Sequence, residues 1–265
     1  MRRRDASFEG DADEQSDPRF VTALGRGLSI LRAFRRGDPA LTNGELASRT
    51  GLPKATVSRL TYTLARLGYL EYVADTSRYR LSIAAFALGF AALGSLGIRD
   101  VARGPMQALA DETGVSVALG VRDGTSMVYI EHCRGDSPLH VGIDVGSHIR
   151  LATSAMGRAC LAALPREERE RVIDRLDLHG APRANVTRDV EQAAVQLAAR
   201  GFVLSIGDWK PEINSAAVPV DLGSGALYAI NCGGPASLLP EQFLIDRVGP
   251  QLIEIARAIV AAVNR

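Results

Sequence analysis

Residues 41–81 read LTNGELASRTGLPKATVSRLTYTLARLGYLEYVADTSRYRL, and their local signals indicate two short helices followed by a β-hairpin. Thr42 and Glu45 have the spacing of a capping box, in which both side chains bind backbone N–H groups at the start of a helix. Gly51 predicts the end of that helix, because glycine readily adopts the left-handed conformation of a C-terminal cap. Pro53 then predicts a second helix, because proline is tolerated at the first helical position.

The second predicted helix has one apolar face and one polar face. Its apolar residues recur at helical spacing and are Val57, Leu60, Leu64 and Leu67. The opposite face carries hydrogen-bond donors and positive charge but no carboxylate, and it comprises Ala55, Ser58, Arg59, Tyr62 and Arg66. A helix that packs by one side and is basic on the other is typical of recognition helices that enter the DNA major groove.

The hairpin completes the pattern of a winged helix-turn-helix. Residues 69–73 and 78–81 predict two strands, with a turn between them. A further helix is predicted at residues 20–36, where the apolar residues at helical spacing are Leu24, Leu28, Leu31 and Phe34. An ordinary helical hairpin packed on a sheet is the alternative, but capping box, turn, proline, face polarity and hairpin together favour DNA binding.

The charge is concentrated in the same part of the chain. The 265 residues have a formal net charge of only +1. Residues 19–81 contain eleven basic and four acidic residues, a net charge of +7, whereas residues 1–18 contain three basic and six acidic ones. A basic module joined to a mildly acidic remainder is typical of a regulator whose second domain binds something other than DNA.

Composition limits the class of protein and its compartment. A hydrophobic content of 46% with 23% charged residues is globular, and the length suffices for two domains. No apolar run is long enough to span a membrane, and the N-terminal arginines lack the apolar segment of a signal peptide. The cysteines are odd in number and far apart, which argues against a disulfide framework. We therefore expect a cytoplasmic protein without membrane contact, with a disordered tail at residues 1–18.

The remainder of the chain predicts an α+β domain. Residues 115–121 and 127–131 alternate in polarity around Asp123-Gly124, which is a strong hairpin signal. Further strands are expected at residues 139–144, 202–205, 216–221 and 226–231. Helices are expected at residues 98–113, 153–164, 165–176, 189–200 and 239–263, with Gly249-Pro250 as a candidate break in the last.

Residues 82–96 predict an apolar helix between the two domains. Its sequence, SIAAFALGFAALGSL, leaves little polar surface, so a helix that stands alone in water is unfavourable. We expect this helix to pair two subunits. The alternative is a helix buried within one subunit.

These motifs resemble those of a known family. Residues 41–81, followed by GSHIRLATSAMGRACLAAL, RGFVLSIGDWKPEINSAAVPV and YAINCGGP, are similar in order and spacing to the IclR family of bacterial transcription regulators. The resemblance implies dimers, or dimers of dimers, with a winged helix and a GAF-like effector domain. We therefore expect a winged helix-turn-helix domain at residues 19–81, a linker helix at 82–97 and an effector domain at 98–265.

The expected DNA-binding residues lie mainly in the second helix. Those expected to face the groove are Ala55, Ser58, Arg59 and Tyr62. Lys54 and Thr56, near the helix N-terminus, are placed for phosphate contacts. Arg59 suits a guanine edge, because its planar guanidinium matches O6 and N7 together; the alternative is a phosphate contact. Arg78, in the hairpin, is expected to reach the DNA backbone or the minor groove.

The resemblance also implies an effector pocket. The matching positions are Val141, Ile149, Ala155, Met156, Ser205, Ser215, Asn231 and Gly233. Ser205 stands where an aspartate is frequent in the family, and Ser215 stands where a cysteine is frequent. Asn231 and Gly233 replace paired serines. These departures disfavour the family's better-known keto acid and favour a neutral or anionic ligand, such as a small carboxylic or aromatic acid.

The single tryptophan, Trp209, lies in the segment that corresponds to the loop bordering the family's pocket. A large amphipathic ring in such a loop often covers a cavity or stacks on a ligand. We expect its fluorescence to report effector binding. The alternative is a ring buried against its own domain and insensitive to ligand.

Metal, catalytic and redox functions have weaker support. The histidines and cysteines lack the spacing of metal ligands, so we expect no metal and no cofactor. Cys232 could serve as a hydrolase nucleophile, but no spacing supplies its base, so we expect no enzyme. Redox sensing remains an alternative control of DNA binding, and its candidate thiols are Cys133, Cys160 and Cys232. The sequence thus predicts a ligand-responsive regulator that binds a pseudo-palindromic double-stranded operator as a homodimer or tetramer.

Overall fold

A computed structural model describes residues 19–35, 37–137, 142–176, 178, 182–223 and 225–263. The chain divides into two compact units, with the boundary between Ser95 and Leu96. The predicted tail at residues 1–18 lies outside the described residues. No single helix of the described segments is long and apolar enough to span a membrane. The neighbouring helices α4 (Ile83–Gly94) and α5 (Gly97–Thr113) pass that criterion only when counted together.

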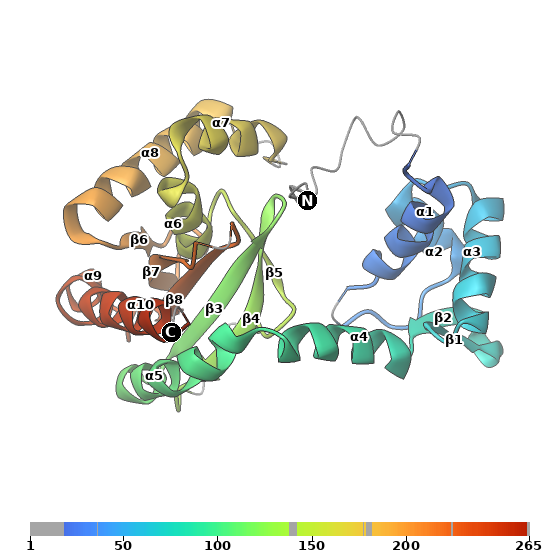
Figure 1. Ribbon diagram of the computed structural model, residues 1–265, viewed down its shortest axis with the longest axis horizontal. Coiled ribbons are helices and arrows are strands. Elements are labelled where there is room, and N and C mark those ends of the chain that lie inside the picture. Colours follow the sequence, from blue (N-terminus) through green and yellow to red (C-terminus); the bar gives the residue numbers. More distant parts are fainter. Residues whose placement is uncertain are drawn as a thin grey trace, which may run out of the picture. The chain divides into compact units, whose positions relative to one another are not determined.

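The N-terminal unit is a winged helix-turn-helix (Figure 1). Its helices are α1 (Thr22–Arg32), α2 (Asn43–Thr50) and α3 (Lys54–Arg66), and its hairpin consists of β1 (Leu70–Val73) and β2 (Arg78–Leu81). The predicted capping box is present, and Gly51 ends α2 with a φ of +69°. The core of this unit consists of Ile30, Leu41, Leu46, Val57, Leu64 and Leu70.

Two details of this unit differ from prediction. The first helix is shorter than residues 20–36, and Leu24 and Leu28 are 61% and 50% exposed while Ile30 is buried. In α3, Leu67 caps the C-terminus and is exposed, whereas Thr61 is fully buried. The Thr61 hydroxyl lies 3.0 Å from the carbonyl of Val57, so a polar residue is accommodated by a bond to the preceding turn.

The predicted linker helix is α4 (Ile83–Gly94), capped by the Ser82 hydroxyl at 3.2 Å from the Ala84 amide. Phe86 and Phe90 are 64% and 66% exposed and stack with ring centroids 5.8 Å apart. All residues of α4 are described, and none is buried in the single chain. The pairing of two subunits through α4 stays a prediction.

The C-terminal unit is built on a six-stranded antiparallel sheet. The strand order is β5-β4-β3-β8-β7-β6, which places the two hairpins β3–β4 and β7–β8 side by side. The strands are β3 (Ser116–Asp123), β4 (Ser126–Arg134), β5 (His148–Arg150), β6 (Val203–Ile206), β7 (Ile213–Asp221) and β8 (Leu227–Pro235). This arrangement confirms the predicted α+β class.

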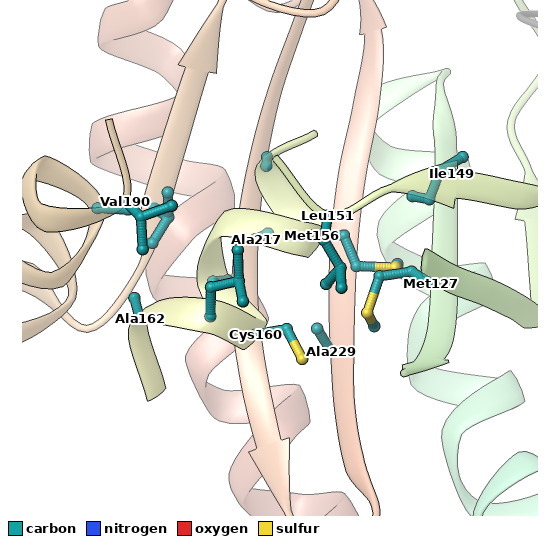
Figure 2. Packing of buried hydrophobic residues seen from close by; sticks show 14 of the residues in the cluster. Met127, Ile149, Leu151, Met156, Cys160, Ala162, Val190, Ala217 and Ala229 are labelled. Atoms are coloured by element: carbon teal, nitrogen blue, oxygen red, sulfur yellow. The ribbon is translucent and has the colours of Figure 1, made fainter. Parts of the chain in front are cut away.

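Helices cover both faces of the sheet (Figure 1). The face with α6 (Ala155–Ala163) also meets α7 (Arg166–Arg175) and α8 (Arg183–Arg200), and their apolar residues form one core with the sheet. Figure 2 shows Met156 and Cys160 of α6 in this core, with Ala229 of β8 close by. The other face meets α5 (Gly97–Thr113) and α10 (Gly249–Val263); the short α9 (Glu241–Phe243) precedes α10.

Some element boundaries in this unit depart from prediction, most clearly at three places. Of the third strand, expected at residues 139–144, residues 142–144 are not in a strand and residues 139–141 lie outside the described ones; the strand that pairs with β4 is β5. The helix expected from residue 189 begins at Arg183. The chain stays helical at Gly249-Pro250, the candidate break, because a π-helical turn (Leu244–Val248) leads directly into α10 there.

Candidate functional site

The solvent side of α3 carries the residues predicted to meet DNA. Those that are exposed are Lys54, Ala55, Ser58, Arg59 and Tyr62, whereas Thr56 is partly buried. The buried hydroxyl of Thr61 lies 3.0 Å from Asn43 Oδ1 and so links α3 to the start of α2. The structure thus fixes α3 by one side and leaves the basic side open, while its contact with DNA stays a prediction.

Arg78 has partners within its own domain that the sequence did not indicate. Its Nη1 donates to the carbonyl of Ala40 at 2.8 Å and to Glu45 Oε2 at 3.1 Å. The same Glu45 oxygen accepts the Thr42 amide of the capping box at 2.7 Å. That backbone hydrogen bond is the main cause that lowers the pKa of Glu45, and Arg78 adds to it. Arg78 therefore attaches the hairpin to the start of α2, and its expected contact with DNA is untested.

The C-terminal unit contains a cavity between the sheet and the N-terminus of α6. Its volume is about 60 Å³, which leaves room for several waters or a small ligand. The described residues that line it are Ser116, Ala118, Tyr129, His132, Arg134, Gly142, Ile143, Ile149, Ser154, Ala155, Trp209, Ile213, Ser215, Asn231 and Gly233.

Strand register explains why residues so far apart in sequence meet at this cavity. One row crosses β4, β3, β8 and β7 and consists of Arg134, Ser116, Gly233 and Ser215. A second row, two residues along, consists of His132, Ala118 and Asn231. Side chains two residues apart on a strand share a face, so both rows point to the same side of the sheet.

A β-bulge adds Tyr129 to this face. Leu119 pairs with Glu131, but the next residue, Gly120, pairs with Tyr129, so Ile130 is an extra residue on β4. Strict alternation along β4 would turn Tyr129 away from the cavity. The bulge reverses the alternation and directs this ring into the lining.

The polar side chains of the lining have defined ionisation. Burial raises the pKa of Tyr129 to about 12, so its phenol stays protonated, and its Oη lies 3.5 Å from Asn231 Oδ1. His132 Nδ1 lies 3.3 Å from Asp144 Oδ1, but burial outweighs this contact and lowers the pKa of His132, which keeps the imidazole neutral at pH 7. Arg134 Nη2 donates to Asp144 Oδ2 at 2.8 Å. Among the described residues of the lining, Arg134 is the permanently charged one.

The N-terminus of α6 borders the same cavity through Ser154 and Ala155. The Ser154 hydroxyl caps the helix and accepts the Gly157 amide at 3.0 Å. A side chain at Gly157 would place a Cβ 2.4 Å from the backbone of Leu151, so this close approach requires glycine. The amides of Ala155 and Met156, like the first amides of any α-helix, have no acceptor within the helix. A helix start of this kind favours an anion.

The predicted pocket residues fall into two groups. Those that line the cavity are Ile149, Ala155, Trp209, Ser215, Asn231 and Gly233. Met156 instead packs in the core (Figure 2). Its sulfur lies so close to Gly120 that a Cβ on that glycine would be only 2.5 Å away. Ser205 is buried on β6 outside the lining, and within the described structure its hydroxyl has no hydrogen-bond partner. Val141 lies outside the described residues.

Several lining residues were missed from the sequence, notably Ser116, Tyr129, His132, Arg134 and Ser154. The alternation of β3 and β4 contained part of this signal, because a single face of β4 carries both His132 and Arg134. The bulge that reorients Tyr129 leaves no comparable mark in the sequence, since it depends on pairing with β3.

The cysteines are poorly placed for redox or nucleophilic chemistry. All three are free and buried. Burial raises the pKa of Cys133 to about 11, and the pKa values of Cys160 and Cys232 to about 12, so the reactive thiolates are disfavoured. Among the described residues, no group of three or more His, Cys, Asp or Glu side chains could hold a metal ion.

Comparison with known proteins identifies relatives along nearly the whole chain. The family description "IclR helix-turn-helix domain" matches residues 23–74, and "Bacterial transcriptional regulator IclR C-terminal" matches residues 90–261. The HTH-type transcriptional regulator TsaQ1/TsaQ2 of Comamonas testosteroni is 34% identical over 95% of this chain and 91% of its own length.

Solved structures agree with this match. An IclR family transcriptional regulator from Brucella abortus superposes with a TM-score of 0.86 and 42% identity, covering 96% of this chain and 97% of the other. An IclR homologue from Microbacterium hydrocarbonoxydans, complexed with 4-hydroxybenzoate, has the same fold, with a TM-score of 0.74, 21% identity and coverage of 91% and 99%.

Proposed function

Because this chain belongs to the IclR family of bacterial transcriptional regulators, we propose that it binds a pseudo-palindromic operator through α3 and responds to a small acid held in the cavity of its C-terminal unit. The observation that carries this proposal is the cavity itself, where a helix N-terminus and Arg134 face a partly aromatic lining. The chain is a DNA-binding regulator and not an enzyme, as its named relatives are regulators.

The DNA-binding part of the proposal is supported by the geometry of α3. The residues we assign to the groove, Ala55, Ser58, Arg59 and Tyr62, are exposed, and Lys54 and Thr56, which we assign to phosphate contacts, lie near the helix N-terminus. Arg59 is the residue we assign to a guanine edge. Because its proposed target is DNA, we place the protein in the cytoplasm.

The acid part of the proposal is supported by the charge and shape of the cavity. Arg134 is cationic, and the amides at the start of α6 add partial positive charge, so a carboxylate is favoured there. The rings of Tyr129, His132 and Trp209 give the lining flat surfaces that suit an aromatic ring. A relative of the same fold is complexed with 4-hydroxybenzoate, which is an acid of this kind.

Assembly into dimers is supported by α4. Its exposed aromatic pair, Phe86 and Phe90, lies on a helix with no buried residue in the single described chain. An apolar surface of this kind is unfavourable in water, and a second copy of α4 would cover it. Association of two dimers into a tetramer is a further part of the proposal.

Titration of Trp209 fluorescence tests the effector assignment. Small carboxylic and aromatic acids, beginning with 4-hydroxybenzoate, are added to the full-length protein while the emission of its single tryptophan is followed. An acid that shifts or quenches this emission should also change operator affinity, because coupling between two binding sites is reciprocal. An acid that calorimetry shows to bind and to release DNA, but that leaves Trp209 emission unchanged, would place the effector elsewhere.

A further inference from the structure

Arg158 is a charged side chain of α6 that is only 9% exposed. It lies one helical turn beyond Ala155, through which α6 lines the effector cavity. Arg158 itself does not line that cavity; it borders a second, polar cavity whose walls include Asp189 and Asp208. Burying a guanidinium costs free energy unless its N–H groups have acceptors. The acceptors of Arg158 therefore show which segments it connects.

Three acceptors surround the guanidinium. Nε donates to the carbonyl of Ala152 at 3.2 Å, in the turn that leads into α6. Nη1 donates to Asp208 Oδ2 at 2.6 Å, and Nη2 lies 3.7 Å from Asp189 Oδ2 on α8. The Asp208 bond has the length of a strong charge-assisted hydrogen bond, whereas the Asp189 contact is only an ion pair.

Two of these acceptors lie close in sequence to residues that line the effector cavity. Ala152 lies two residues before Ser154, the capping residue of α6 that lines the cavity. Asp208 immediately precedes Trp209, which lines the cavity from the loop between β6 and β7. One arginine therefore connects the helix start that would receive an acid to the loop that would cover it.

The loop has other hydrogen bonds, most of them to its own base; the Glu212 carbonyl also accepts the Ala236 amide, beyond the end of β8, at 2.8 Å. The Gly207 amide donates to Asn214 Oδ1 at 3.1 Å and to the Ile213 carbonyl at 3.2 Å. The Ile213 amide donates to the Lys210 carbonyl at 2.9 Å, within the loop itself. These bonds shape the turn, while the bond from Arg158 to Asp208 fixes its position relative to α6.

We propose that Arg158 is a positioning residue that, through Asp208, holds the Trp209 loop against the start of α6 in the geometry that receives the effector. This inference rests on the proposed function, because it assigns a role within the effector site. Loss of the tie leaves the loop in a mixture of positions, of which only a fraction can bind. Apparent affinity then falls in proportion to that fraction.

A measurement without ligand tests the tie directly. Acrylamide quenching of the single tryptophan is compared in the full-length wild type, Asp208→Ala, Asp208→Glu and the matched control Asp189→Ala. Asp208→Ala should increase the quenching constant of Trp209, and Asp208→Glu should restore a value near that of the wild type. Asp189→Ala removes another acid beside the same guanidinium and should leave quenching unchanged. Equal quenching in Asp208→Ala and wild type, or equal increases in both alanine variants, would overturn the inference.

A second measurement uses 4-hydroxybenzoate as the probe. Asp208→Ala should raise its apparent Kd by roughly three- to tenfold, as expected if about a tenth to a third of the molecules keep the competent loop. Asp189→Ala should bind like the wild type, and thermal unfolding should show the same midpoint for both variants. An Asp208→Ala variant with more quenching but wild-type affinity would overturn the positioning role. Failure of the wild type to bind the probe would count against the aromatic-acid proposal alone, since the quenching result still decides on the tie.

Discussion

At the scale of single residues, identical side chains have different roles according to their partners. Arg59 is exposed on α3, whereas Arg78 bonds to Ala40 and Glu45 within the domain. Both are arginines in a basic DNA-binding module, and the sequence alone assigned both to DNA. Substitution should separate an arginine that reads a base from one that supports the domain.

Arg59→Ala should reduce operator affinity by about 1–3 kcal/mol and relax preference at one base pair in each half-site. The reason is that the variant loses the bidentate contact to guanine, so it no longer distinguishes guanine from other bases at that one position. Binding measured against a set of operators with single base changes checks this expectation. Equal weakening on every sequence would instead identify Arg59 as a phosphate contact.

Arg78→Gln should weaken binding by at most about fivefold, because exposed ion pairs contribute about 0.2–1 kcal/mol. Glu45→Gln is the matched change, since glutamine can still complete the capping box with Thr42 while its charge is removed. If Arg78 acts through Glu45, the double variant should bind no worse than Arg78→Gln, and the dependence of affinity on salt should keep its slope. A phosphate contact would give additive losses and a slope smaller by about 0.9.

At the scale of elements, α4 is the helix whose apolar surface lacks a cover in the single chain. Ile83, Phe86 and Phe90 share one side of this helix and Leu88 lies on the opposite side, and each is more than half exposed. The aligned, stacked rings of Phe86 and Phe90 suit a flat, self-complementary contact, as two-fold dimers require.

Phe90→Glu should therefore lower the mass measured by light scattering and weaken operator binding at the same time. A charge introduced into a buried dimer interface has no partner and is costly. Val195→Glu is the control, because Val195 is equally exposed but lies on α8. A Phe90→Glu protein that stays dimeric would show that α4 is not the interface.

At the scale of the whole molecule, the two compact units have separate cores, one in the helix-turn-helix and one between the sheet and α6. An effector confined to the C-terminal unit should stabilise that unit selectively. At a ligand concentration one hundred times Kd, the gain is about 2.7 kcal/mol, which corresponds to a rise of roughly 5–10 °C in Tm.

Calorimetry should accordingly show two unfolding transitions, of which saturating effector shifts one. A winged-domain transition that moves equally with ligand would contradict an effector site confined to the C-terminal unit. Comparison with the isolated residues 1–95 would identify which transition belongs to the DNA-binding unit.

The sequence by itself determined the features that depend on neighbours along the chain. Thr42 and Glu45 form the capping box, Gly51 ends α2, and Asp123-Gly124 joins β3 to β4, because each signal acts over a few residues. The resemblance to a family supplied much of the cavity lining, including Trp209 and Asn231. It also predicted Met156, which packs in the core and does not line the cavity.

Only the tertiary structure decided the features that depend on contacts between distant segments. The bulge at Ile130 turns Tyr129 into the cavity, and it exists only because β4 pairs with β3 in that register. Arg78 finds Glu45 thirty-three residues away, and Arg158 finds Asp208 fifty residues away. No local pattern encodes such partners, because an arginine's charge is satisfied by whichever acceptor the fold brings within reach of its side chain.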